Sequence, residues 1–371
     1  MKKKRVIYIV SNISKAVAFE WVVEELDSKI ELEFICLNNN TDTSLVRFLK
    51  QNQIPVKEYK LGSKIQMLML WLKLFILLLN KRPNVIHTHL FEASLLGLSA
   101  AKLAGVKNRI YTRHYSIYHH KYFPKMVKYD RMINSFSTKV IAISKNVYSI
   151  LKNKEGVNEE KIELVEHGFK LEKFKNIPVD EVLSLKGKYD IPENKWTVGI
   201  VSRYIKWKGV EYGIRAFNAF KKKYPNTHLI LANSGGPYQK EIKEELNKLT
   251  NDSFTEIPFE ENLFALYQLF DCFVHCPIDD SVEAFGQTYI ESLASEVPSI
   301  FTKSGIANDF IVHDKNAFVV DYKSSLEIEL GLNKIFKEED YKKNLKANGL
   351  KSVEPFALKS MIVKLESLYD F

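Results

Sequence analysis

The chain has 371 residues, of which 46% are hydrophobic and 27% are charged, so it can bury the cores of about two domains. Its 15 glycines and 11 prolines are too few for a collagen-like or linker-dominated chain. A net charge of +9 predicts an anionic partner: nucleic acid, an anionic membrane or a phosphorylated small molecule. Cys36, Cys272 and Cys276 cannot form a disulfide framework, which indicates a reducing compartment.

The first half alternates short apolar strands with longer helical patterns. Strands are predicted at Val6–Val10, Leu32–Cys36, Val56–Glu58, Val85–His87, Arg109–Thr112 and Val140–Ile143. Helices are predicted near Lys15–Leu26, Thr43–Gln51, Ile65–Asn80, Ala93–Leu103 and Lys125–Phe136. This order predicts a parallel sheet with helices on both faces.

The longest apolar run is Ile65–Leu79, IQMLMLWLKLFILLL. It falls short of the ~20 residues that a membrane-spanning helix needs, and Lys73 interrupts it. Because it is apolar on nearly all sides, we expect a buried core helix in preference to one that inserts into a membrane surface. The basic start MKKKR precedes too short an apolar run for a signal peptide, so we expect a cytoplasmic protein.

The alternation is interrupted at residues 176–194, where two prolines and several charges predict a domain boundary. Further strands are predicted at Thr197–Val201, Leu229–Ala232, Cys272–Cys276 and Ser299–Phe301. Further helices are predicted at Val210–Tyr224, Tyr238–Leu249, Leu263–Phe270, Gly286–Ala294, Ser325–Phe336, Glu339–Asn348 and Phe356–Tyr369. We expect an α/β protein of two Rossmann-like domains that face each other across a cleft, with ligands outside the carboxyl ends of the strands.

The segment 277–321 carries the clearest chemical pattern. Glu283 is expected in a loop after a strand, and Glu291 in the helix that follows. That helix would begin around Phe285, Gly286, Gln287 and Thr288. The free backbone N–H groups of such a helix start suit a diphosphate, whereas the two carboxylates can accept hydrogen bonds from sugar hydroxyls. The pattern therefore predicts a nucleotide-sugar site.

Two other motifs follow predicted strand ends. Arg203 comes after one strand, and Lys208 with Gly209 precedes the next helix, so two cations are available for a diphosphate leaving group. Gly236 and Pro237 come after the following strand, where a glycine lets the backbone approach a ligand closely.

The order of these motifs resembles the retaining GT-B glycosyltransferases of family 4. The segments VIHTHL, RIYTRHYS, VIAISKNV and VEHGF in the first half look like that family's corresponding segments, so the resemblance covers most of the chain. It implies an acceptor-binding domain at residues 1–180 and a donor-binding domain at residues 185–355. It also implies that the last helix, residues 356–371, packs back on the first domain.

The resemblance also implies roles for the matching residues. Arg203 and Lys208 match the pair on the donor diphosphate, Glu283 the carboxylate that holds the transferred sugar, and Glu291 the one that holds the nucleotide ribose. Other donor-binding positions are implied at Gly236, Pro237, Phe285, Gly286, Gln287 and Thr288. The family transfers hexoses with retention and without a divalent metal, so no metal or cofactor is expected.

In the first domain, His114 matches a family histidine near the sugar and the acceptor, and His89 is expected to line the cleft. The loop SNISKAVAFE lacks the glycines that the family usually has there, and His167 stands in place of the family's usual Asn. The base-binding loop, residues 256–260, is also off pattern, so uracil and guanine are not distinguished.

Some residues allow more than one interpretation. His87 and His89, and the pair Cys272 and Cys276, could suggest metal sites, but a core histidine and a buried strand are favoured because no further ligands join them. The segment Arg113–Arg131 mixes cations with aromatics, which suits single-stranded nucleic acid or a membrane interface. The family resemblance favours the membrane.

The resemblance therefore implies a metal-independent retaining hexosyltransferase. It would move a sugar from a UDP- or GDP-sugar to a glycan or a polyprenyl-diphosphate-linked acceptor in capsule or lipopolysaccharide synthesis. We expect peripheral contact with the inner face of the cell membrane and no nucleic-acid partner. The alternatives are an epimerase or phosphorylase of the same fold, and a non-catalytic basic protein that binds nucleic acid or membrane. A polyanion binder gains nothing from carboxylates in its anion site, so Glu283 and Glu291 speak against the last alternative.

Overall fold

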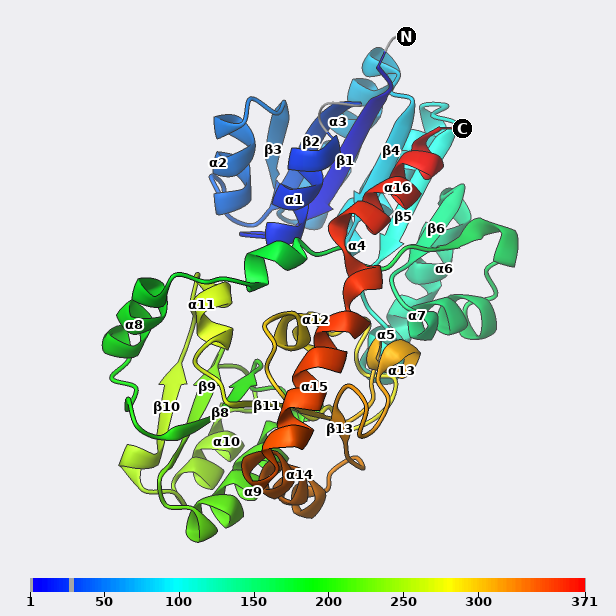
Figure 1. Cartoon of the computed structure of the whole chain (residues 1–371). Helices are drawn as coiled ribbons and strands as arrows, with labels where there is room; N and C mark the ends of the chain where they lie inside the picture. Colours follow the sequence, from blue (N-terminus) through cyan, green and yellow to red (C-terminus); the bar gives the residue numbers. More distant parts are fainter. Residues whose placement is uncertain (1–2, 27–29, 371) are drawn as a thin grey trace. The chain divides into compact units, whose positions relative to one another are not determined.

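The computed structural model describes residues 3–26 and 30–370, and the chain divides into two compact units (Figure 1). Unit 1 runs to Phe169 and resumes at Phe356, and unit 2 is Lys170–Pro355. The division comes before the position expected near residue 180, because the 3₁₀ turn Leu171–Phe174 belongs to unit 2. There the Phe174 ring packs edge-on against Phe264, with ring centroids 4.9 Å apart.

Unit 1 contains a seven-stranded sheet in which every neighbouring pair is parallel. Its strands are β1 Arg5–Ser11, β2 Glu31–Asn38, β3 Val56–Lys60, β4 Val85–His89, β5 Asn108–Arg113, β6 Lys139–Ala142 and β7 Ile162–Leu164. The spatial order is β3-β2-β1-β4-β5-β6-β7, so the order reverses between β1 and β4. The apolar runs of the central strands are buried on both faces, which is why they lack polar alternation.

Helices connect these strands, as the alternating pattern predicts. They are α1 Val17–Leu26, α2 Ser44–Gln51, α3 Lys64–Lys81, α4 Phe91–Leu103, α5 Tyr118–Tyr122, α6 Val127–Phe136 and α7 Lys145–Ser149, the last continued by a π-helical turn Ile150–Lys154. A final helix, α16 Leu358–Tyr369, comes from the end of the chain.

The α16 helix (red in Figure 1) lies alongside the strands of unit 1. Two backbone hydrogen bonds join the start of α16 to the segment that follows β7, one from Phe169 N to Phe356 O and one from Leu358 N to Phe169 O. At the other end, the Tyr369 hydroxyl is 2.7 Å from His87 Nδ1 and 2.5 Å from the Tyr8 hydroxyl. The returning helix is thus an integral part of the unit 1 core.

The prediction that the apolar helix at residues 65–79 is buried is wrong. Of α3, only Leu70, Leu74 and Leu78 are fully buried, at a four-residue spacing that forms one narrow face against the sheet. The opposite face is apolar as well and is exposed to solvent. The pattern does not distinguish the two faces, because both consist of large aliphatic side chains.

Unit 2 contains a six-stranded parallel sheet in the order β10-β9-β8-β11-β12-β13. Its strands are β8 Trp196–Val201, β9 Thr227–Ala232, β10 Phe254–Ile257, β11 Cys272–His275, β12 Ser299–Phe301 and β13 Phe318–Val319. Its helices are α8 Val179–Lys188, α9 Val210–Lys223, α10 Gln239–Leu246, α11 Leu263–Tyr267, α12 Gln287–Ala294, α13 Ala307–Phe310, α14 Ser325–Lys337 and α15 Glu339–Ser352. Cys272 and Cys276 are buried free thiols, as the strand interpretation predicts.

Three short strands and the four helices α5, α7, α8 and α13 are not apparent from the sequence. β7, β10 and β13 have two to four residues each, and their sheet positions depend on pairing with β6, β9 and β12. The helix α8 lies within the segment 176–194, which the sequence indicates as a boundary.

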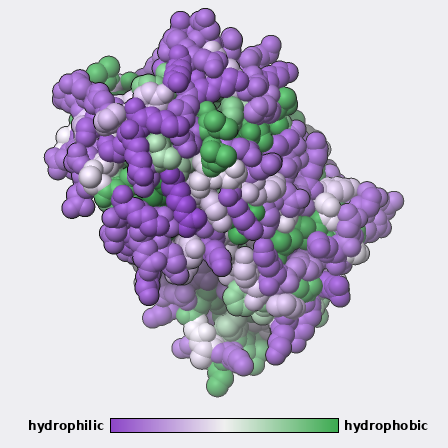
Figure 2. Space-filling view, turned by 90° about the horizontal axis from the view of Figure 1, so that it is seen from below, coloured by the Kyte–Doolittle hydropathy of each residue, from purple (hydrophilic) through white to green (hydrophobic). Residues whose placement is uncertain are grey.

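Among the described residues, no helix is both long and apolar enough to cross a bilayer. On the face shown in Figure 2, hydrophilic residues predominate and apolar residues occur in separate patches.

Candidate active site

The candidate donor site lies where the strand order of unit 2 reverses. β8 and β11 are neighbours in the sheet. The strands that follow β8, β9 and β10, lie on one side of this pair, and the strands that follow β11, β12 and β13, lie on the other. The loop after β8 carries Arg203 and Lys208, and the loop after β11 carries Glu283. In open parallel sheets, ligands bind in the crevice at such a reversal. The predicted positions of these three residues after strand ends are therefore confirmed.

Lys208 and Glu283 form the central contact of this site. Lys208 Nζ is 2.5 Å from Glu283 Oε1, and the carboxylate is 8% exposed. A third group, His275 at the end of β11, has its Nε2 atom 3.4 Å from the same oxygen. Burial alone would raise the pKa of Glu283, but the charge of Lys208 and the contact with His275 outweigh it and hold the pKa at about 2. Glu283 is therefore ionised at neutral pH.

The backbone around Lys208 has a shape that only glycine permits. Gly209 adopts a left-handed conformation, with φ of 65°, at the start of α9. A Cβ atom at that position would be 2.1 Å from the carbonyl oxygen of Cys276. This close approach holds the end of β11 against the start of α9, and it fixes Lys208 beside the loop that carries Glu283.

The start of α12 lies directly after Glu283. Gly286 is the N-cap residue with φ of 88°, and it offers no capping side chain to the first backbone N–H groups. Phe285 is buried and Gln287 is exposed, while the half-buried Thr288 has a hydroxyl with no hydrogen-bond partner among the described residues. The helix start therefore leaves hydrogen-bond donors for an anion, together with the favourable end of the helix dipole.

Glu291 lies one and a half turns into α12 and has a different environment. Its carboxyl is buried, and the Tyr267 hydroxyl on α11 donates a hydrogen bond of 2.8 Å to Oε2. Burial raises the pKa of Glu291 to about 7, against the opposing effect of the tyrosine hydrogen bond. The two carboxylates of the motif thus differ, with Glu283 ionised and Glu291 close to half-protonated at neutral pH.

The loops after β8 and β9 are joined to each other. Tyr204 N donates to Gly235 O at 2.8 Å, and a Cβ atom at Gly236 would be 2.4 Å from Tyr204 O. Arg203 and Pro237 are exposed on these two loops. The structure therefore brings the Arg203 segment and the Gly236-Pro237 segment together.

In unit 1, three histidines lie in a row at the carboxyl ends of the strands. His89 Nδ1 is 3.0 Å from His114 Nε2, and the His114 ring stacks on His167 with centroids 5.5 Å apart. Burial and the neighbouring imidazoles lower the pKa of both His89 and His114, so both rings are neutral at pH 7. His89 is buried, whereas His114 is half-buried. A neutral imidazole can accept or donate a hydrogen bond to a hydroxyl group.

His275 and Tyr267 were not singled out as site residues by the sequence. His275 is the one strongly polar side chain within the apolar strand CFVH, which is a usable signal for a group directed at a site. Tyr267 is 24 positions from Glu291, and no local pattern links them. Within the described part of the chain, no group of three or more His, Cys, Asp or Glu side chains is placed to hold a metal ion.

Comparison with known proteins gives the family. The model named Glycosyltransferase Family 4 matches residues 22–173, and the model named Glycosyl transferases group 1 matches residues 183–352. The capsular polysaccharide biosynthesis glycosyltransferase CapM of Staphylococcus aureus is 25% identical, with 100% of this chain and 98% of CapM covered. The alpha-monoglucosyldiacylglycerol synthase of Acholeplasma laidlawii is also 25% identical, with 94% and 88% covered.

A solved structure shows the same fold. The crystal structure of Anabaena HepE in complex with UDP-glucose has a TM-score of 0.86 and 19% identity, covering 99% of this chain and 100% of that one. A glycosyltransferase from Rickettsia africae has a TM-score of 0.81 and 20% identity, covering 100% and 98%. With two parallel-sheet units and both family models matched along its length, the chain belongs to the GT-B glycosyltransferases of family 4.

Proposed function

We propose that this enzyme transfers a hexose from a UDP- or GDP-sugar to a glycan or a lipid-linked acceptor, with retention of anomeric configuration. The observation that carries the proposal is the Lys208–Glu283 pair beside the open start of α12. A diphosphate needs cations and N–H donors, and a sugar needs hydrogen-bond acceptors. One small region of unit 2 holds both.

In the proposed complex, the donor diphosphate lies against Lys208, Arg203 and the N–H groups at the start of α12. Lys208 then exchanges its contact with Glu283 for a phosphate oxygen, and the freed Glu283 oxygen accepts a hydrogen bond from a hydroxyl of the transferred sugar. The pKa of Glu283 is about 2 while Lys208 and His275 contact it, so the carboxylate is ionised when this exchange begins. Glu291 takes a ribose hydroxyl, for which a buried carboxyl is well suited.

For the transfer itself we propose a same-face reaction. The bond between the anomeric carbon and the phosphate oxygen breaks, and the acceptor oxygen forms its bond on the same face. The acceptor proton passes to the leaving phosphate, which Lys208 and Arg203 stabilise as negative charge develops. His114, held by His89, is the proposed unit 1 contact for the sugar or the acceptor. No step in this scheme requires a metal ion.

The relatives support the proposed class of product. CapM is named for capsular polysaccharide biosynthesis, and the Acholeplasma enzyme is named for a glucosylated diacylglycerol. HepE was solved with UDP-glucose, which makes a UDP-sugar the first donor to test. Two mycobacterial relatives, 28% identical over 44% of this chain, are named as GDP-mannose-dependent, so GDP-sugars belong in the same test.

The test is a metal-free thermal-shift panel with UDP, GDP, ADP, CDP and their common sugars. A ligand present at 100 times its dissociation constant adds about 2.7 kcal/mol, which is easily seen as a rise in melting temperature. The proposal is supported if the melting temperature rises with the nucleotides of one base only and if this rise is smaller in the variant Arg203→Ala. If the folded protein shifts with no nucleotide, the proposal fails. Conversion of the donor without any acceptor would instead favour an epimerase.

A further inference from the structure

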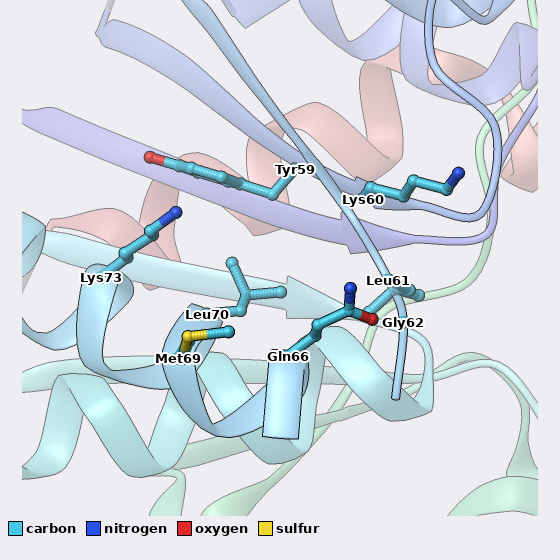
Figure 3. A pocket seen from close by; sticks show the side chains of 8 residues that line it. All are labelled: Tyr59, Lys60, Leu61, Gly62, Gln66, Met69, Leu70 and Lys73. Carbon is cyan, nitrogen blue, oxygen red and sulfur yellow. The ribbon is translucent and has the colours of Figure 1, made fainter. Parts of the chain in front are cut away.

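One nitrogen of the His275 ring is buried and unpaired. The side chain is 2% exposed, and Nε2 has no hydrogen-bond partner among the described residues. An unpaired buried polar atom destabilises a fold, so its presence needs a reason. Of the described side chains that line the groove between β3 and α3 in unit 1 (Figure 3), none has such an atom. The His275 nitrogen lies instead in the candidate donor site.

The unpaired nitrogen faces the carboxylate of Glu283. Nε2 is 3.4 Å from Oε1, which is longer than the roughly 2.7–3.2 Å of an N–H···O hydrogen bond. Lys208 Nζ is 2.5 Å from the same oxygen. Because a charged donor binds a carboxylate more strongly than a neutral donor does, the ammonium group holds this oxygen and keeps it away from the imidazole. His275 is therefore a second donor for Glu283 that is not engaged while Lys208 is in place.

The protonation state of His275 suits this role. Burial lowers the pKa of the imidazole, so the ring is neutral at pH 7 and carries a single N–H group. Beside an ionised carboxylate that proton belongs on Nε2, because a nitrogen lone pair at this position would face the oxygen lone pairs of Glu283. The ring thus presents an N–H group to Glu283 without adding a charge to the site.

The imidazole is held in place by its neighbours. The Tyr289 ring packs edge-on against it, with centroids 4.8 Å apart, and the Tyr289 hydroxyl donates a hydrogen bond of 2.9 Å to Thr302 O. Tyr289 is confined in turn, since a Cβ atom at Gly286 would be 2.7 Å from its ring. His275 is also part of β11, whereas Glu283 belongs to a loop. The carboxylate is therefore the partner that can move.

The proposed function supplies the event that pairs the two groups, and this inference rests on it. When Lys208 turns to a phosphate oxygen of the donor, it releases Glu283 Oε1. We propose that His275 is a positioning residue whose Nε2–H group then donates a hydrogen bond to Glu283 and holds the carboxylate for the transferred sugar. A carboxylate oxygen has two lone pairs, so Oε1 can accept from His275 and from a sugar hydroxyl together.

This role predicts a distinct pH dependence. The titratable groups that face Glu283 are Lys208 after β8, His275 in β11 and Tyr289 in α12, and burial raises the pKa of Tyr289, which is therefore neutral. Without His275, Lys208 still holds Glu283 in the free enzyme. In the donor complex the carboxylate would lose both donors, and burial would raise its pKa. The acid limb of kcat should therefore move to higher pH, while that of kcat/KM stays nearly in place.

The first test is NMR of the full chain with ¹⁵N-labelled histidine, with UDP and GDP as separate probes. The chain has nine histidines, and comparison with His275→Gln assigns the His275 signal. Binding of the nucleotide should move the Nε2–H proton of His275 downfield, as a new hydrogen bond does. The variant Lys208→Met should show the moved signal without nucleotide, because the competing ammonium group is gone.

Two results of this experiment have different meanings. An unmoved His275 signal, although calorimetry shows that a nucleotide is bound, would overturn this inference alone. Failure of both UDP and GDP to bind the folded protein would overturn the proposed function and this inference with it.

The second test is turnover of UDP-glucose and GDP-mannose, measured as release of the nucleotide. His275→Phe keeps an aromatic ring and removes the N–H group, so it should lower kcat at least about tenfold at pH 6 and much less at pH 8, since each pH unit below a pKa lowers the ionised fraction about tenfold. Its affinity for the bare nucleotide should stay within about twofold of the wild type, because the diphosphate contacts do not include His275.

Two further variants separate positioning from packing. His275→Gln retains an N–H donor at a similar reach and should restore most of kcat at pH 6. The matched control is His228→Phe, at a buried histidine near the start of β9 whose Nε2 is 2.9 Å from Thr255 Oγ1, and it should leave the pH dependence of kcat unchanged. A loss in His275→Phe that is equal at all pH values and is not restored by glutamine would assign His275 a structural role and overturn the inference.

Discussion

The Lys208–Glu283 pair predicts an asymmetry between two substitutions that remove the same contact. Lys208→Met leaves a carboxylate buried without its main partner. Glu283→Gln leaves an ammonium group that is 22% exposed and can turn toward water. Removal of one member of a buried ion pair is costly chiefly because the other charge stays buried. Lys208→Met should therefore destabilise unit 2 more than Glu283→Gln does, although each breaks one contact.

The magnitude follows from the pKa of Glu283. Its fall from 4.5 to about 2 corresponds to about 3 kcal/mol of net favourable interaction with the ionised form. His275 at 3.4 Å retains part of this, so we expect Lys208→Met to cost about 2–3 kcal/mol. Glu283→Gln keeps a polar group for Lys208 and should cost about 1 kcal/mol. The double variant contains no buried charge at this position and should resemble Glu283→Gln.

The assay must report unit 2 alone, because the two units need not unfold together. Hydrogen exchange along a urea series at pH 7, read on peptides from β11 and α12, meets this need. An equal loss of unfolding free energy in the two single variants, or a smaller loss in Lys208→Met than in Glu283→Gln, would refute the reasoning. In that case the carboxylate is not held by Lys208 in the way that the structure shows.

Other predictions concern turnover, pH and metal ions. Glu283→Gln should lower turnover at least about 100-fold with little loss of fold, whereas Glu241→Gln, an exposed carboxylate on α10, should leave steady-state rates unchanged. Because the pKa of Glu291 is raised to about 7 in the folded state, the wild type loses stability as the pH rises from about 4.5 through 7. The variant Glu291→Gln lacks this titration, so its melting temperature relative to that of the wild type should increase between pH 5 and pH 8. An unchanged difference between the two melting curves would show that Glu291 titrates normally. EDTA should not abolish transfer in a radiolabelled-sugar assay, and loss of activity that Mg²⁺ or Mn²⁺ restores would contradict the metal-free scheme.

The sequence predicts the elements of the candidate donor site well because the relevant pattern is local. A strand, a loop with Glu283, a glycine and a helix with Glu291 follow one another within about twenty residues, and each step has its own signal. The alternation of strands and helices likewise predicts two parallel sheets, since short apolar runs between helices rarely form anything else. The positions of Arg203 and Lys208 follow once β8 is recognised.

The features that the sequence does not predict depend on contacts between distant segments. Tyr267 reaches Glu291 from another helix, and it shapes the environment in which that carboxyl is buried. β13 is a two-residue strand that exists only because β12 offers backbone partners. The exposure of α3 also escapes prediction, since a helix that is apolar on both faces carries no signal for which face meets water.

The return of α16 to unit 1 has a consequence for how the protein is made. Unit 2 is one continuous segment, whereas unit 1 needs residues from both ends of the described chain. At translation rates of about 5–20 residues per second, the ribosome spends on the order of 10–40 s between Phe169 and Phe356. During that interval the nascent unit 1 lacks Ile362, Leu365 and Tyr369, which are buried in the finished fold. Unit 2 can therefore mature first, while the unfinished sheet of unit 1 is the part of the nascent chain that a chaperone would need to shield.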